Sequence, residues 1–345
     1  MTSQDVHSLC RAGGIPGDNN PPELVETHIS WVLIGHQFVY KIKKPLHYSF
    51  LDFSTPEKRS YYCRQEVDLN RRLTEDIYLG VLPVRQKGDK CLLDGTEGSI
   101  IDHAVWMRKM DPARRMDLLA RKGSVNDNDI VTLASLLARF HQDTTMIPTA
   151  PEDGDEPAMQ RLFNDLSEQT SFLNSFAGPA AGDTIRQAID WSDQFLHENA
   201  GLIASRRSAG FFRDGHGDLH CRNIFLLDKP QVFDCIEFSD ELRQIDVLND
   251  IAFLCMDLDS CGLADLSHRF FRLYTNAFPC AAKPADRLLF HYYKAYRANI
   301  RAKINSLRAR TAPTDAERAA ATSAAIAYLR LLDSYRQTAG RTAKA

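Results

Sequence analysis

The sequence lacks a long apolar run and lacks any excess of basic residues. Its most apolar stretches, such as 325–332, fall well short of the roughly 20 residues that a membrane-spanning helix needs. Lysine and arginine number 42 against 45 aspartate and glutamate residues, which gives a formal net charge of −3. Because no net positive field is present to attract polyanions, we expect neither nucleic acid nor a membrane as a partner.

The sequence also lacks a paired-cysteine motif and an export signal. Its eight cysteines are irregularly spaced, and none of them form a Cys-x-x-Cys pair. The amino terminus shows no basic segment followed by an apolar block, which is the pattern of a secretory signal. We therefore expect a cytoplasmic protein with reduced thiols, without a disulfide or zinc framework.

The chain of 345 residues is long enough for two folding units. Residues 1–23 are polar and rich in Gly, Pro, Asn and Asp, and we predict a disordered tail there. Residues 24–107 predict two strands around Gly35, a helix, and three further strands. The helix is expected over 56–73, because Ser54 and Thr55 offer hydroxyl caps before Pro56 and Glu57.

Residues 108–345 have a helical character. Apolar residues recur at helical spacing over 130–141, and further helices are expected up to about residue 338. Two short β-like runs, 224–227 and 231–234, interrupt this pattern. The whole chain is therefore expected to be α+β, with a β-rich first part and a mainly helical second part.

The most informative stretch is His216-Gly217-Asp218-Leu219-His220-Cys221-Arg222-Asn223, which precedes a short strand. Asp218 is followed five residues later by Asn223, and Asp234 ends the next short strand. Phosphoryl transfer needs a carboxylate that orients the incoming hydroxyl, and oxygen ligands for the Mg²⁺ that neutralises the phosphates. We assign Asp218 as the catalytic base and Asn223 and Asp234 as the metal ligands.

This assignment requires a lysine on an upstream strand and a glutamate on the following helix. Lys41 lies in the strand that ends Phe38-Val39-Tyr40-Lys41, and Glu66 lies within the next predicted helix. Lys43 is the rival of Lys41, since it lies on the same side of the strand two residues later. Asp68 is a shorter and less suitable partner than Glu66.

Five stretches together resemble the aminoglycoside phosphotransferase and choline kinase superfamily, and within it a bacterial group of aminoglycoside phosphotransferase family enzymes. The resemblance spans about residues 24–310. The matching stretches are Glu26-Thr27-His28-Ile29-Ser30-Trp31-Val32, Val39-Tyr40-Lys41-Ile42-Lys43-Lys44-Pro45, Phe50-Leu51-Asp52-Phe53-Ser54, His216 to Asn223, and Asp250-Ile251-Ala252-Phe253.

The resemblance implies a two-lobed, protein-kinase-like fold that binds ATP and Mg²⁺. Residues 24–107 would form an N-lobe with a five-stranded sheet, residues 108–345 a helical C-lobe, and residues 104–110 the hinge. It also implies that Asp250 braces the catalytic loop from a helix behind it. The residues expected to bind the nucleotide are Lys41, Glu66, Ser30, Trp106 and Met107.

The sequence departs from the protein-kinase pattern in two places. No Gly-x-Gly-x-x-Gly loop precedes Lys41, so hydroxyl and backbone N–H groups of the hairpin near Thr27 and Ser30 would hold phosphates. Gly217 stands where protein kinases usually have arginine, which fits the small-molecule branch. We therefore expect a phosphotransferase that acts on a hydroxyl group of a small-molecule acceptor; the acceptor and the oligomeric state stay open.

Three alternatives remain. The first is a nucleotide-binding regulatory module, or pseudokinase, without turnover. The second is protein phosphorylation, against which stand Gly217 and the short distance from Asp234 to the next predicted helix. The third is a metallohydrolase built on His216, Asp218 and His220, which leaves Lys41 unexplained.

A basic stripe lies on the predicted helix around residues 291–303. Lys294, Arg297 and Arg301 follow one another at i, i+3 and i+7, so they share one helix face. We interpret this stripe as a solvated face, and the alternative is a basic wall of the acceptor pocket. A basic pocket suits an anionic acceptor and does not suit a polycationic aminoglycoside.

Overall fold

The chain folds into two compact units in a computed structural model. It describes residues 1–342 apart from 12–13, 17, 19, 49–50 and 151–153. Four positions of the expected tail, and Phe50 of the family resemblance, therefore lie outside the described residues. The first unit comprises residues 1–119, 216–218 and 222–243, and the second comprises residues 120–215, 219–221 and 244–345.

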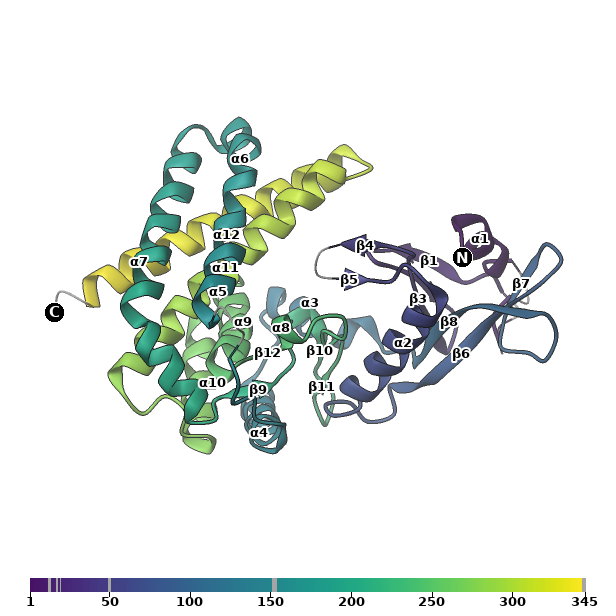
Figure 1. Cartoon of the computed structure of the whole chain (residues 1–345), viewed down its shortest axis with the longest axis horizontal. Coiled ribbons are helices and arrows are strands. Elements are labelled where there is room, and N and C mark those ends of the chain that lie inside the picture. Colours follow the sequence, from purple (N-terminus) through teal and green to yellow (C-terminus); the bar gives the residue numbers. More distant parts are fainter. Residues whose placement is uncertain (12–13, 17, 19, 49–50, 151–153, 343–345) are drawn as a thin grey trace. The chain divides into compact units, whose positions relative to one another are not determined.

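An antiparallel sheet of six strands forms the centre of the first unit (Figure 1). The predicted hairpin around Gly35 is confirmed, with Trp31 opposite Ile42 in its register. The sheet has one strand more than expected, because a short polar strand beside the expected tail pairs with the hairpin. In spatial order, the strands are β1 (Glu23–Glu26), β2 (Ser30–Ile34), β3 (Phe38–Lys43), β8 (Ser99–Arg108), β6 (Tyr78–Lys87) and β7 (Lys90–Leu93).

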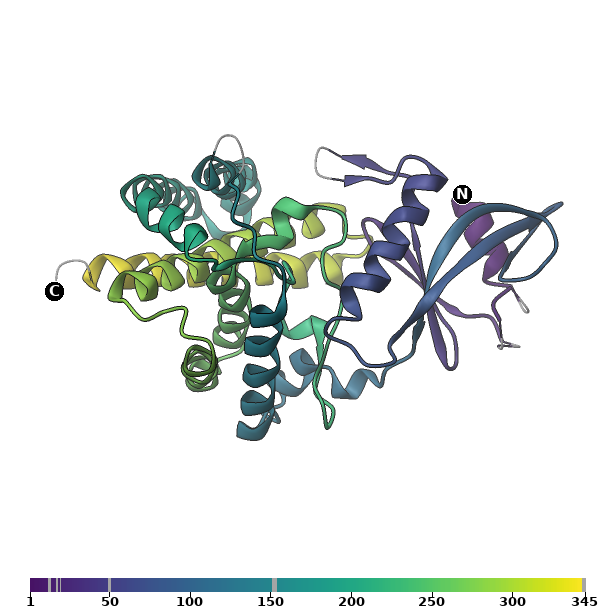
Figure 2. The same ribbon diagram turned by 60° about the horizontal axis from the view of Figure 1, so that its bottom comes forward.

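Helix α2 (Pro56–Asn70) lies across one face of this sheet, against β8 and β6 (Figures 1 and 2). It begins where the sequence predicts, because the Thr55 hydroxyl accepts a hydrogen bond from the Lys58 N–H at 3.3 Å. An apolar cluster fills the space beneath it. This cluster contains Cys63 and Val67 of the helix and Ile77, Tyr78 and Val105 of the sheet side.

The opposite face of the sheet is covered by α1 (Ser3–Leu9), inside the segment for which the sequence predicts a disordered tail. The Thr2 side chain and the Asp5 carboxylate form a capping box at its first turn. Val6 and Leu9 are completely buried against Leu33 and the rest of the sheet core. The two apolar residues sit three apart on one helix face, a spacing too short to stand out in the polar segment.

Short elements complete the first unit, and they include the segment 222–243 that the sequence assigns to the helical lobe. A two-stranded antiparallel hairpin, β10 with β11, lies directly before Asp234. The elements are β4 (His47–Tyr48), β5 (Leu51–Asp52), the 3₁₀ helices Pro112–Arg114 and Cys221–Asn223, α3 (Met116–Arg121), β10 (Ile224–Phe225), β11 (Gln231–Val232) and α8 (Asp240–Arg243).

The second unit is mainly helical, as the sequence predicts. Two of its long helices, α11 (Pro284–Thr311) and α12 (Asp315–Thr342), pack against each other along their length (Figure 2). Residues 155–177 do not form one continuous helix but break into α5, a 3₁₀ turn and α6. The elements are α4 (Asp127–Asp143), α5 (Asp155–Asn164), the 3₁₀ helix Asp165–Gln169, α6 (Thr170–Ala177), α7 (Ala180–Ser208), β9 (Phe212–Asp214), β12 (Gln244–Asp246), α9 (Val247–Ser260), α10 (Ala264–Ala277), α11 (Pro284–Thr311) and α12 (Asp315–Thr342).

The interpretation of the α11 basic stripe as a solvated face is wrong for two of its three residues. Lys294 is buried and its Nζ lies 2.5 Å from Oδ2 of Asp259 on α9. Arg297 is also buried, and its Nε donates to the Asn249 side chain at 2.8 Å. Both cations are therefore used inside the helical unit, because α9 offers them polar partners that periodicity alone does not reveal.

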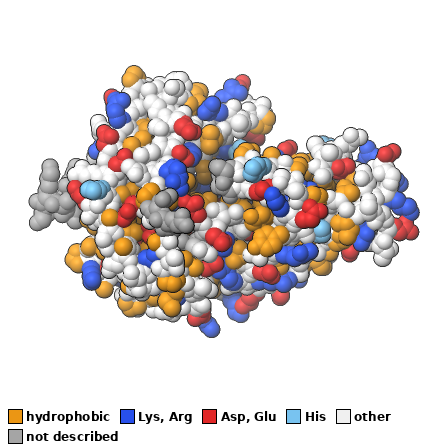
Figure 3. All heavy atoms as spheres, in the orientation of Figure 1, with side chains coloured by type: hydrophobic (Ala, Val, Ile, Leu, Met, Phe, Trp, Pro, Cys, Tyr) orange, Lys and Arg blue, Asp and Glu red, His pale blue; other side chains and the backbone are white. Residues whose placement is uncertain are grey.

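The surface carries both signs of charge. Over the face seen in Figure 3, basic and acidic side chains are interspersed, which agrees with the small net charge. Among the described residues, no helix is both long enough and apolar enough to cross a membrane. All eight cysteines are free thiols, as expected, and six of them are buried.

Candidate active site

The His216 side chain holds the loop that carries Asp218 in place through two hydrogen bonds. Its Nε2 lies 3.0 Å from the Phe233 carbonyl, and its Nδ1 lies 3.2 Å from the Asp218 backbone N–H. The carbonyl can only accept and the N–H can only donate, so the ring carries its proton on Nε2. His216 therefore supports the loop by hydrogen bonding, and both ring nitrogens are occupied.

Gly217 is required by the backbone at this turn. Its φ is +83°, a left-handed conformation that favours glycine. A Cβ at this position would lie 2.7 Å from the Leu242 carbonyl oxygen, which is closer than real Cβ atoms approach. The residue that separates this chain from the protein-kinase pattern is thus explained by a close backbone contact.

Asn223 orients Asp218. The Asn223 side-chain amide donates to the Asp218 carbonyl at 3.0 Å and to the Asp218 carboxylate at 3.2 Å. This arrangement uses the amide nitrogen of Asn223 within the loop. The 3₁₀ turn Cys221–Asn223 brings the two side chains together over a five-residue separation.

The loop also has a support that sequence reasoning missed. The Cys221 backbone N–H donates to the Asp257 carboxylate at 2.9 Å, and the Tyr328 hydroxyl donates to the other carboxylate oxygen at 3.0 Å. Asp250, the expected brace, is fully buried and lies 3.1 Å from Nε2 of His141. Asp257 lies in helix α9, which is almost entirely buried. An acidic residue in such an apolar run is the sequence signal that could have identified Asp257 as a supporting residue.

Asp234 follows the β10–β11 hairpin and adopts a strained backbone conformation, with φ of +63°. Its backbone N–H donates to the Tyr78 hydroxyl at 3.2 Å. The preceding residue, Phe233, donates its N–H to the Asn223 carbonyl at 3.0 Å. One backbone hydrogen bond therefore ties the segment of Asp234 to Asn223, the other expected metal ligand.

Lys41 connects the sheet to this segment. Its Nζ lies 2.9 Å from Oε1 of Glu66 on α2 and 2.7 Å from Oδ1 of Asp234. The predicted Lys41–Glu66 pairing is thus present, and Asp68 is exposed on α2. Burial lowers the pKa of Lys41, but the Asp234 and Glu66 carboxylates outweigh it and hold the pKa well above its ordinary value.

Lys43 contacts the same glutamate. Its Nζ lies 2.6 Å from Oε2 of Glu66 and also forms an ion pair with Glu237. Lys43 is completely buried, whereas the Lys41 side chain is 13% exposed. Of the two rival lysines, Lys41 is therefore the one with access to a ligand, and Lys43 is internal.

The β3–β8 register separates the two residues expected beside the adenine. Met107 pairs with Val39, two residues from Lys41, and its side chain packs with the α2-side cluster. Trp106 pairs with Tyr40 and packs against the opposite sheet core, so its side chain lies on the other face from Lys41. The strand alternation thus places Met107, and not Trp106, on the Lys41 face.

Ser30 is at the start of β2 and is completely buried. Its hydroxyl has no hydrogen-bond partner among the described residues, and its backbone N–H donates to the Thr27 hydroxyl at 2.9 Å. In this conformation the Ser30 side chain is not open to a nucleotide.

Two aspects of metal binding follow from these contacts. Within the described part of the chain, no group of three or more His, Cys, Asp or Glu side chains is placed to hold a metal ion. Mg²⁺ commonly takes only one or two protein oxygens and completes its shell with phosphates and water, so Asn223 and Asp234 fit it chemically. The metallohydrolase alternative instead needs His216 as a ligand, and both nitrogens of that ring are already occupied.

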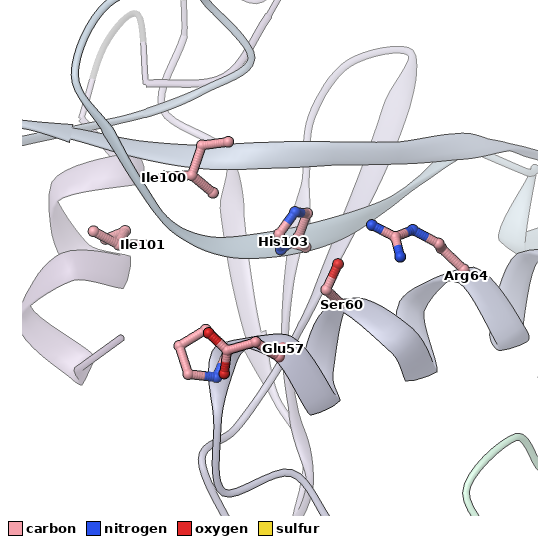
Figure 4. Close-up of a pocket in the computed structure, with 7 residues that line it drawn as sticks. Glu57, Ser60, Arg64, Ile100, Ile101 and His103 are labelled. Atoms are coloured by element: carbon pink, nitrogen blue, oxygen red, sulfur yellow. The ribbon is translucent and has the colours of Figure 1, made fainter.

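A shallow pocket of about 290 Å³ lies elsewhere, between α2 and β8 (Figure 4). Figure 4 shows Ser60 and Arg64 of α2 turned toward His103. Within the described residues, Ser60 Oγ and His103 Nδ1 are buried and lack a hydrogen-bond partner. The lining residues are Pro56, Glu57, Ser60, Arg64, Ile100, Ile101 and His103, none of which is a predicted site residue.

The sequence is similar to uncharacterized proteins of Mycobacterium tuberculosis and Mycobacterium bovis. The identity is 33% over 285 residues, which covers 82% of this chain and 54% of each mycobacterial protein. The chain therefore spans about half the length of the curated relatives it matches. No protein-family model matches the sequence.

Solved structures similar to this chain include choline/ethanolamine kinases and aminoglycoside phosphotransferases. A choline/ethanolamine kinase family protein from Mesorhizobium loti has a TM-score of 0.52 at 16% identity and covers 97% of this chain and 99% of its own. Choline kinase from Cryptosporidium parvum has a TM-score of 0.54 at 11% identity, covering 96% and 95%. The GDP complex of aminoglycoside 2'-phosphotransferase-IIIa has a TM-score of 0.51 at 12% identity, covering 92% of each chain. The chain thus shares the α+β, kinase-like fold of these kinases and phosphotransferases, as the resemblance in its sequence predicts.

Proposed function

We propose that this chain is an ATP- and Mg²⁺-dependent phosphotransferase that phosphorylates a hydroxyl group of a small molecule. The observation that carries the proposal is the meeting of Lys41, Asp234, Asn223 and Asp218 within the first unit. Phosphoryl transfer is catalysed mainly by positioning and by neutralising charge, and these groups supply both. The fold shared with phosphotransferases, one of them solved with GDP, supports nucleotide binding.

Each residue has a chemical role in this proposal. Lys41, held by Glu66, binds nucleotide phosphate oxygens. Asn223 and Asp234 hold Mg²⁺, which neutralises charge that develops on the phosphates. Asp218 accepts the proton of the acceptor hydroxyl, and the Asn223 amide keeps its carboxylate in place.

The acceptor is constrained only in part. The hypothesis of a basic acceptor wall on α11 loses support, since Lys294 and Arg297 are buried with internal partners. A preference for an anionic acceptor therefore no longer follows. Met107 is the apolar side chain on the Lys41 face that we propose lies beside the base of the nucleotide.

The test is Mg²⁺-dependent release of ADP or GDP, with wild type beside Asp218→Asn. The acceptor panel covers aminoglycosides, amino sugars, sugars, amino alcohols and hydroxy acids. We expect one class to stimulate release in the wild type, and the variant to lose a factor on the order of 10²–10⁴ in kcat while nucleotide still binds. Nucleotide binding without release across the panel favours a regulatory module, and absence of nucleotide binding contradicts the proposal.

A further inference from the structure

We propose that Lys43 and Glu237 form a buried pair that sets how tightly Lys41 is held by its carboxylates, and thereby how available Lys41 is to nucleotide phosphates. The inference rests on the proposed nucleotide-binding role of Lys41. It assigns two further positioning residues, neither of which touches the nucleotide. Lys43 acts on Lys41 through Glu66, and Glu237 acts through Lys43.

The geometry makes Glu66 a shared ligand of two lysines from one strand. Lys41 and Lys43 are two positions apart on β3, so both side chains project from the same face of the sheet. The Lys41 ammonium group donates a hydrogen bond to Oε1 of Glu66 at 2.9 Å, and the Lys43 ammonium group donates one to Oε2 at 2.6 Å. Each oxygen of the carboxylate therefore has its own cation, and Lys43 prevents Lys41 from binding both.

Glu237 completes the second half of the arrangement. It lies three residues after Asp234 and forms an ion pair with Lys43. The same segment is tied to the catalytic loop, because the Ile236 N–H donates to the His216 carbonyl at 3.1 Å. Lys43 therefore joins three elements: β3, helix α2 and the segment that carries the expected metal ligand.

The environment makes these charges strongly interdependent. Lys43 and Glu66 are completely buried, the Glu237 side chain is 3% exposed, and the Phe53 ring lies 4.9 Å from Nζ of Lys43. Burial opposes the charge on Lys43, yet Glu237 and Glu66 outweigh it and raise its pKa. Burial raises the pKa of Glu237, and Lys43 opposes that shift. Lys43 is thus the internal counterion that balances both glutamates.

The Lys43–Glu237 pair affects nucleotide binding through the net charge of the cluster, which is an effect that packing contacts alone would not produce. The cluster contains two lysines and three carboxylates, Asp234 included, and so carries one net negative charge. Removing Lys43 leaves Lys41 as the only cation among three carboxylates, which hold it more firmly. Removing the charge of Glu237 has the opposite effect, because the cluster becomes neutral. Removing both restores the original net charge.

The test compares ATP·Mg²⁺ dissociation constants by calorimetry for wild type, Lys43→Met, Glu237→Gln and the double variant. Lys43→Met should bind on the order of tenfold more weakly, the size expected for one unit charge roughly 12 Å from the phosphates at an effective dielectric constant of about 20. Glu237→Gln should bind at least as tightly as wild type. The double variant should return to within about threefold of the wild-type value. The matched control is Lys87→Met with Glu97→Gln, an exposed ion pair between β6 and the turn that precedes β8, which should leave binding unchanged.

The order of affinities decides between positioning and a merely structural role. Loss of packing would weaken binding in all three variants together, with the double variant worst, and that result overturns the inference. Wild-type affinity in Lys43→Met overturns it as well. If Lys43→Met does not fold, weaker binding by Glu237→Gln is the overturning result, since that change keeps the side-chain shape. If the wild type turns over and the variants show any of these overturning patterns, the proposed function still stands. If the wild type binds no nucleotide, the proposed function and this inference are both contradicted.

Discussion

The Asp234 carboxylate lies 2.7 Å from Nζ of Lys41, so the expected metal ligand is paired with a cation of the chain itself. In the proposed function, nucleotide-bound Mg²⁺ competes with Lys41 for this carboxylate. Because the released lysine then meets the phosphates, metal binding and phosphate binding are expected to be coupled. The coupling makes Asp234 the residue at which the metal requirement is tested.

Asp234→Asn should lose most of the Mg²⁺ dependence of ATP binding. The amide keeps the shape but cannot supply the charge that holds the cation. Calorimetric titration with ATP, with Mg²⁺ and with EDTA, measures the effect; we expect the two dissociation constants to converge in the variant and to differ by tenfold or more in wild type. An equal Mg²⁺ dependence in both proteins would exclude Asp234 as a metal ligand.

Gly217→Ala should destabilise the loop that carries Asp218. The new Cβ would meet the Leu242 carbonyl at 2.7 Å, in a backbone with φ of +83°. We expect a loss of roughly 1–3 kcal/mol in the free energy of unfolding, together with a fall in kcat because Asp218 is adjacent. Gly201→Ala is the control, since Gly201 lies inside α7 with open space around its Cβ position. That change should stabilise by about 0.5–1 kcal/mol.

Glu66 should make the stability of the protein depend on pH in the acid range. Burial opposes its charge, but Lys41 and Lys43 outweigh burial and lower the pKa of Glu66 from 4.5 to about 2. A carboxylate whose pKa is lower in the folded state than in the unfolded state stabilises the fold at pH values above the unfolded-state pKa. This contribution disappears as the pH falls through the folded-state pKa. The difference in unfolding free energy between wild type and Glu66→Gln, from urea titrations, should therefore shrink between about pH 5 and about pH 2.

Glu237→Gln provides the contrast for that experiment. Burial raises the pKa of Glu237, so its contribution is present at low pH and is lost as the pH rises through the raised value. Its difference from wild type should change with the opposite sign, and at pH values above the ordinary value of 4.5. The same sign for both variants would contradict the assigned pKa directions.

Ser60→Ala should leave the free energy of unfolding unchanged or raise it. Ser60 Oγ in the α2–β8 pocket is buried without a partner among the described residues, so its removal breaks no hydrogen bond. Ser192→Ala is the matched control, because Ser192 Oγ lies 2.9 Å from the Tyr292 hydroxyl in the helical core. We expect that control to destabilise by about 1–3 kcal/mol, measured by chemical denaturation. Equal losses in the two variants would show that Ser60 has a partner.

The residues of the candidate site could be predicted wherever the chemistry is local. His216 to Asn223 lies within eight residues, and a single 3₁₀ turn assembles it, so its spacing alone identifies the loop. Lys41 and Glu66 could be predicted because a strand followed by a capped helix fixes their faces. The hairpin around Gly35 was predictable for the same local reason.

Contacts between distant segments could not be predicted in this way. Trp106 and Met107 are neighbours in sequence, and only the β3–β8 register decides which one shares a face with Lys41. Asp257 and Lys294 depend on how α9, α11 and α12 pack, which the helical period of each does not encode. Strand β1 is too short and polar to be recognised before it pairs with β2.

The sequence by itself determined the loop from His216 to Asn223, because its residues follow a short-range pattern. Its resemblance to known proteins predicted the kinase-like fold, and the kinase pattern predicted the pairing of Lys41 with Glu66. Only the tertiary structure decided that Glu66 is shared with Lys43 and that Glu237 closes the cluster. The physical reason is burial: a charge placed in the interior must find a counterion, and folding brings that counterion from almost 200 residues away.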